Sequence, residues 1–98
     1  MLLAHAVTLG QARSYVAALA DAALTPDASI EYDRVLLQID FVHGDYVPGI
    51  SPVPVTDRDE LFDVAESSIE DLARHGIDFL TVEIVLDMLW AARELDAP

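Results

Sequence analysis

The sequence predicts a single α+β domain in which helices cover one face of a small antiparallel sheet. Three observations support this prediction. Apolar residues recur at helical spacing in three segments, and apolar side chains alternate with a period of two after Arg34. The dipeptide Gly44-Asp45 follows the alternating segment and suits a hairpin turn. A chain of 98 residues has room for one domain, residues 1–98, with one core.

A first helix is predicted for residues 9–24. Thr8 and Gln11 have the spacing of a capping box, and Thr25-Pro26-Asp27 is typical of a helix end. The predicted inner face consists of apolar residues at helical period, namely Leu9, Ala12, Val16, Leu19, Ala20 and Ala23. The apolar residues 1–7 are the candidate for an additional strand.

A β-hairpin is predicted after this helix. Residues 35–42 alternate with a period of two and are rich in β-branched and aromatic types, which is typical of a strand. Gly44 supplies the positive φ of a type II′ turn. Pro48, Pro52 and Pro54 cannot donate to a sheet, so the returning segment is predicted to be an edge strand or an irregular arm. Residues 48–54 suit either a partner-binding loop or an edge protected against aggregation.

Two further helices are predicted at the C-terminal side, over residues 58–75 and 79–95. Asp57 and Glu60 have the spacing of a capped helix start, and Gly76 follows a basic last turn. Asp78 then caps the next helix. Only three residues separate the two helices, so they are predicted to fold back on each other as a helical hairpin.

The charge of the chain limits its partners. It carries five arginines, no lysine and 18 acidic residues, which gives a net charge of −13. Nucleic acids and anionic membranes require a cationic surface, so neither is an expected direct partner, and a basic protein is favoured. The composition of a GC-rich genome or of a salt-rich cytoplasm would explain the same acidity without a partner.

Composition also excludes several classes of protein. No cysteine is present, which excludes disulfides, thiolate nucleophiles and cysteine-ligated metals. Residues 1–7 lack the positive start of an export signal, and the most apolar window, residues 79–92, is too short and too acidic to span a bilayer. A cytoplasmic location is expected.

An acidic surface on the helical hairpin is the predicted partner-binding site. Acidic side chains recur along one stripe of the helix over 58–75, where like charges oppose helix formation. Trp90 lies within the polar stripe of the next helix, and tryptophan often anchors protein interfaces. The predicted docking residues are Asp63, Glu66, Glu70, Glu83, Asp87, Trp90 and Glu94. Proteins of this type include inhibitors and immunity or antitoxin proteins that neutralise a basic toxin, and mimics of nucleic-acid charge; the alternative is a merely solvated face.

A second hypothesis is a small enzyme or ligand-binding subunit. His43 at the hairpin tip, with Asp40 and Asp45 nearby, would provide groups for proton transfer. The third predicted helix is apolar on more than one face, which favours a homo-oligomer interface. The sequence holds no nucleophile elbow and no glycine-rich phosphate loop. His5, His43 and His75 fall in three different predicted elements, so neither a metal nor a cofactor is expected.

Overall fold

The computed structural model describes residues 1–44 and 47–97, and every regular element in this part of the chain is helical. The elements are α1 (Leu3–Ala22), α2 (Pro26–His43), α3 (Arg58–Asp71), a short 3₁₀ helix η1 (Leu72–His75) and α4 (Phe79–Leu95). The described residues contain no strand, so the predicted α+β class with a β-hairpin is wrong. The protein is a four-helix domain.

The predicted strand over residues 35–42 is the second half of α2. Thr25 begins this helix: its side chain accepts a hydrogen bond from the Ala28 N–H at 3.1 Å, and Pro26 occupies the first turn. The buried side of α2 has helical spacing and consists of Ala28, Tyr32, Val35 and Ile39. Leu37 and Phe41, which complete the period-two pattern, are 66% and 82% exposed. The apparent period of two therefore arose from two different faces of one helix. Val35 and Ile39 belong to its buried face, and Leu37 and Phe41 belong to its exposed face.

The predicted hairpin is wrong as well, although the positive φ predicted for Gly44 is confirmed. Gly44 has a φ of +73° and ends α2, with its N–H donating to the Asp40 carbonyl at 3.1 Å. Asp45 and Tyr46, the other residues of the predicted turn and return, lie outside the described residues. Residues 47–57 then connect α2 to α3 without forming a strand or a helix.

The first helix begins earlier than predicted. Residues 3–7, most of the candidate strand, belong to the first turns of α1, and Thr8 lies inside the helix rather than capping it. The two C-terminal predictions agree closely with the structure. The segment 58–75 is α3 followed by η1, and residues 79–95 are α4. Asp57 and Asp78 cap these helices through the N–H groups of Glu60 and Thr81, each at 3.2 Å.

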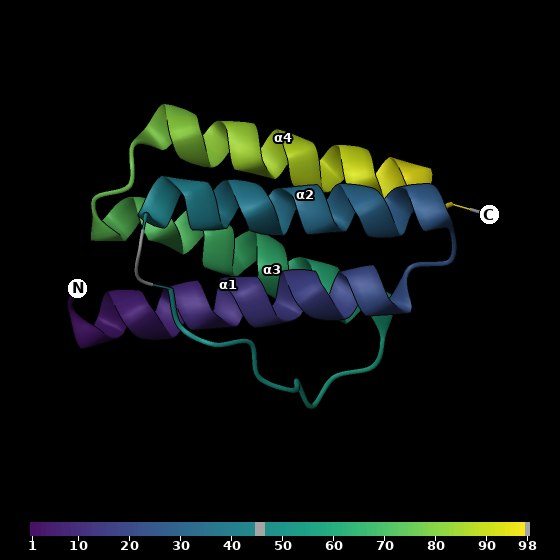
Figure 1. The fold of residues 1–98 in the computed structure, drawn as a ribbon, viewed down its shortest axis with the longest axis horizontal. Coiled ribbons are helices and arrows are strands. Elements are labelled where there is room, and N and C mark those ends of the chain that lie inside the picture. Colours follow the sequence, from purple (N-terminus) through teal and green to yellow (C-terminus); the bar gives the residue numbers. More distant parts are fainter. Residues whose placement is uncertain (45–46, 98) are drawn as a thin grey trace.

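The helices form a bundle in which each neighbouring pair is antiparallel (Figure 1). Helix α1 packs against α2 and α3, and α4 packs against the same two helices. Within the described part of the chain the diagonal pairs, α1 with α4 and α2 with α3, lie farther apart, with no Cα atoms of one helix within 8 Å of the other. All four helices contribute to the core, whose largest buried side chains include Leu9, Leu19, Tyr32, Ile39, Leu61, Phe62, Ile69 and Leu89.

This arrangement gives the bundle two different ends. The start of α1, the end of α2, η1 and the start of α4 meet at one end, on the left in Figure 1. We call it the histidine end, because it holds His5, His43 and His75. The opposite end consists of the α1–α2 turn, the start of α3 and the end of α4. We call it the Asp96 end.

The connection from α2 to α3 is held along α1 by Arg13. This arginine is only 8% exposed. It forms a two-pronged ion pair with Asp40, with Nε–Oδ1 and Nη2–Oδ2 distances of 2.6 and 3.1 Å, and it also donates to the Pro48 carbonyl. Further along, the Ser51 N–H donates to Ser14 Oγ at 3.0 Å. One buried guanidinium thus joins α1, α2 and the connection.

Candidate partner-binding surface

The predicted docking residues lie along α3 and α4, which are antiparallel neighbours. Helical spacing places Asp63, Glu66 and Glu70 in one stripe of α3 and Glu83, Asp87, Trp90 and Glu94 in one stripe of α4. All are at least partly exposed. The contact between Glu66 and Trp90 fixes the register, so the two stripes run side by side.

Trp90 is held in a defined position between the two helices. Its indole N–H donates to Glu66 Oε2 at 2.6 Å, and its ring meets Phe62 edge to face with a centroid distance of 4.9 Å. Phe62 is fully buried, whereas Trp90 remains 46% exposed. The indole is therefore fixed on one side and open to solvent on the other.

Three residues that the sequence reasoning did not select complete this junction. The Arg93 guanidinium lies 4.4 Å from the Phe62 ring centre and 5.3 Å from that of Trp90. Its Nη2 also contacts Asp59 Oδ1 at 3.2 Å. Such stacking on two rings is favourable for a guanidinium. Arg93 follows Trp90 by one helical turn, and Phe62 precedes Glu66 by one helical turn. This spacing was the only sign in the sequence that these side chains would lie beside the predicted docking residues.

All five arginines of the chain are paired with carboxylates of the chain itself. The pairs are Arg13–Asp40, Arg34–Glu31, Arg58–Asp96, Arg74–Asp71 and Arg93–Asp59. Among the residues that the structure describes, none of these pairs includes Asp63, Glu66, Glu70, Glu83, Asp87 or Glu94. The predicted docking stripe is therefore an acidic surface whose charge is not neutralised within the described part of the protein.

The surroundings of His43 differ from the predicted site, in which Asp40 and Asp45 would lie near its ring. Asp40 is bound by Arg13, and Asp45 lies outside the described residues. His43 instead meets His5, with 3.2 Å between their Nε2 atoms, and His75 stacks on His5 with ring centres 5.1 Å apart. The folding of residues 35–43 as a helix explains this difference, because an antiparallel α1–α2 pair brings the start of α1 to the end of α2.

The imidazoles influence one another at this end. Burial lowers the pKa of His5, and electrostatic repulsion from the nearby His43, His75 and amino terminus lowers it further. The His75 Nε2 lies 3.3 Å from the Thr8 hydroxyl. Among the described residues, no three histidine or acidic side chains converge on a single metal position.

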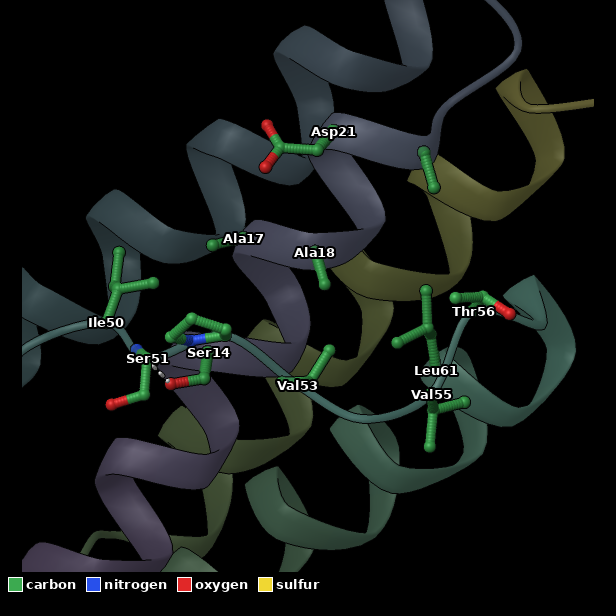
Figure 2. A pocket seen from close by; sticks show the side chains of 12 residues that line it. Ser14, Ala17, Ala18, Asp21, Ile50, Ser51, Val53, Val55, Thr56 and Leu61 are labelled. Carbon is green, nitrogen blue, oxygen red and sulfur yellow. Dashed lines mark hydrogen bonds between the residues drawn. The ribbon is translucent and has the colours of Figure 1, made fainter.

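The hollows elsewhere on the surface include two open grooves. A shallow groove of about 580 Å³ runs between α1 and residues 50–56, and Figure 2 shows mostly small and apolar side chains around it, with Asp21 at one edge. A second groove lies between α2 and α4, where Leu37, Phe41 and Met88 provide its apolar wall. Neither groove holds a cluster of groups suited to catalysis.

Comparison with protein-family models, with curated proteins and with solved structures gives no match for this chain. Within the described residues, no helix is both long and apolar enough to cross a membrane.

Proposed function

We propose that the protein is a non-catalytic module that docks onto a basic protein through the acidic α3–α4 surface. The half-exposed Trp90, fixed by Glu66 and Phe62 and bordered by unneutralised carboxylates, is the observation that supports this proposal. The proposal covers inhibitors and immunity or antitoxin proteins that neutralise a basic toxin or nuclease, and mimics of nucleic-acid charge.

The two parts of this surface have different roles in binding. The carboxylates attract a cationic protein from a distance and raise the association rate, and this effect weakens as salt is added. Trp90 supplies a rigid apolar anchor, and little side-chain freedom is lost when it binds because its ring is already held. Glu66 accepts one hydrogen bond from Trp90, and a carboxylate keeps further acceptor positions for an arginine of the partner.

The experiment begins with capture of bound proteins from lysate of the source cells at low salt, followed by elution with a salt step. A basic protein eluted in this way is then purified, and its association and dissociation rates are measured against the wild-type chain. Glu70→Lys with Asp87→Lys reverses two charges of the surface without touching the contact that holds Trp90. Asp21→Lys with Asp33→Lys is the matched control, because it makes the same charge change on α1 and α2.

The proposal predicts a lower association rate for the Glu70→Lys, Asp87→Lys variant than for its control. Trp90→Ala should mainly raise the dissociation rate, since an anchor acts after encounter. Equal losses in the two charge variants would show that overall charge, rather than this surface, drives binding. An unchanged dissociation rate for Trp90→Ala would remove the anchor from the proposal.

Self-association through α4 is a second candidate. It is favoured by the exposed apolar side chains Phe79, Leu80 and Ile84 of α4, and by the neighbouring Phe41 of α2. Light scattering on the purified chain tests it directly. A dimer that becomes monomeric in Ile84→Glu supports this candidate, and a monomeric wild type at high concentration contradicts it.

A further inference from the structure

The histidine end brings together three imidazoles that are far apart in the sequence. His5 comes from the start of α1, His43 from the end of α2 and His75 from η1. The Nε2 atoms of His5 and His43 lie 3.2 Å apart. Among the described residues, no carboxylate oxygen lies within 4.0 Å of a ring nitrogen of these histidines, so they are not held together by ion pairs.

The orientation of His43 is fixed by the backbone. Its Nδ1 lies 2.8 Å from the Ile39 carbonyl, which can only accept, so Nδ1 carries the ring proton. The neutral ring therefore presents the lone pair of Nε2 toward His5. Metal-binding histidines usually have this arrangement, in which one ring nitrogen donates to a carbonyl and the other faces the metal.

We propose that the Nε2 atoms of His5 and His43 bind a divalent transition-metal ion of the Zn²⁺ or Ni²⁺ type. A metal that binds two imidazole nitrogens at 2.0–2.1 Å with a tetrahedral angle holds them about 3.3 Å apart, close to the separation found here. Imidazole nitrogen suits zinc and nickel, whereas magnesium and calcium prefer oxygen ligands. The negative charge of the chain also attracts cations to its surface.

Binding requires a change of tautomer in His5 and a turn of the two rings, because both Nε2 lone pairs must face the ion rather than each other. In the metal-free pair, His5 donates its Nε2–H to the lone pair of His43. When the ion binds, the ring proton of His5 moves to Nδ1 and Nε2 becomes a ligand, so the protein gains and loses no proton. Water completes the coordination shell. His75 supplies no ligand in this arrangement: its ring stacks on His5 with only 5° between the planes, and its Nε2 contacts Thr8.

The test is calorimetric titration of the full chain, prepared without a polyhistidine tag, with Zn²⁺ and separately with Ni²⁺. Excess Mg²⁺ in the buffer occupies carboxylate sites, which would otherwise bind divalent ions weakly. The variants are His5→Asn and His43→Asn, with His75→Gln as the matched control. Circular dichroism verifies that each variant keeps its helices, and the thermal midpoint with and without Zn²⁺ provides a second readout.

The proposal predicts one saturable site in the wild type and a thermal midpoint raised by Zn²⁺. Loss of a ligand should weaken binding by at least about tenfold, the lower range for losing even a supporting residue. His5→Asn and His43→Asn should also lose the thermal shift, and His75→Gln should bind nearly as the wild type does. No saturable site in the wild type, or an affinity equal to that of the wild type in both asparagine variants, would overturn the proposal. So would a loss in His75→Gln as large as in the other two.

Discussion

The two ends of the bundle are held by different chemistry. At the Asp96 end, the buried Asp96 carboxylate accepts from the Leu24 N–H at 2.7 Å and from Arg58 at 3.0 Å. There the Thr25 hydroxyl also donates to the Leu95 carbonyl at 2.8 Å. At the histidine end, the side-chain contacts between elements are imidazole contacts at 3.2–3.3 Å and ring stacking, and His43 also contacts the Ile39 carbonyl of its own helix at 2.8 Å.

Because of this difference, we expect one end to contribute mainly to folding stability and the other to ligand binding. Charge-assisted hydrogen bonds to a buried group contribute more than neutral ones, and both oxygens of the buried Asp96 carboxylate already accept a hydrogen bond. Neutral imidazoles contribute less to stability, but their nitrogens are good ligands. We therefore expect the Asp96 end to dominate folding stability and the histidine end to respond to added ions.

The largest expected effect is that of Asp96→Ala. The change leaves the Leu24 N–H and the Arg58 guanidinium without their partner at a buried position. We expect a loss of about 2 kcal/mol in the free energy of unfolding, below the full value for a buried pair because Arg58 is partly exposed. Urea unfolding followed by circular dichroism measures it. A loss no greater than that of His43→Asn would erase the contrast between the ends.

A second effect concerns alkaline pH at the Asp96 end. Burial of Tyr32, together with the nearby Asp96 carboxylate, raises its pKa to about 12. The unfolded chain releases this phenolic proton near pH 10 while the folded chain keeps it, so stability falls as pH rises from about 10 to 12. One proton gives a slope of at most about 1.4 kcal/mol per pH unit.

Tyr32→Phe removes this particular pH dependence. Urea midpoints measured from pH 8 to the alkaline range should therefore decline less steeply in Tyr32→Phe than in the wild type. Tyr15→Phe, which removes a hydroxyl from a half-buried residue of α1, is the control. Parallel declines in Tyr32→Phe and the wild type would rule out Tyr32 as their source.

A third and smaller effect is expected for Thr25→Ala. Thr25 caps α2 and also binds the Leu95 carbonyl, so its loss removes two hydrogen bonds at the Asp96 end. Loss of a helix cap of this kind typically costs about 1 kcal/mol. Thr25→Ser, which keeps a hydroxyl, should recover most of the loss in the same unfolding assay. Failure of serine to do so would assign the effect to the methyl group instead.

The smallest effect is expected at the histidine end. Without added metal, His43→Asn loses one backbone contact and one imidazole contact at a half-buried position. We expect less than about 1 kcal/mol in urea unfolding, since single neutral hydrogen bonds contribute about that much. A larger loss would show that the histidine end is also a main support of the fold.

The C-terminal half was predictable from sequence because its signals are unambiguous. Asp57, Asp78 and Gly76 mark helix ends, and the apolar residues of α3 and α4 follow a single helical period. Helix α2 was missed because Val35 and Ile39 satisfy both a helical and a strand period, while Leu37 and Phe41 are apolar without being buried. Thr25-Pro26 suits the end of one helix as well as the start of the next.

The candidate sites show the same limit. Helical spacing alone placed the acidic stripes, but the contact of Trp90 with Glu66 and the part played by Arg93 depend on the register between α3 and α4. The meeting of His5 and His43, separated by 38 positions, follows only when α2 is recognised as a helix antiparallel to α1. Because residues 35–42 were predicted to be a strand, the cluster of His5, His43 and His75 was not predicted.

The antiparallel packing of every neighbouring pair of helices has an electrostatic consequence. Each helix carries partial positive charge at its start and partial negative charge at its end. Each end of this bundle combines two helix starts with two helix ends, so the backbone contributions largely cancel. The long-range field of the protein is thus set by its side chains, and exchanging single carboxylates on α3 or α4 changes that field without altering the backbone.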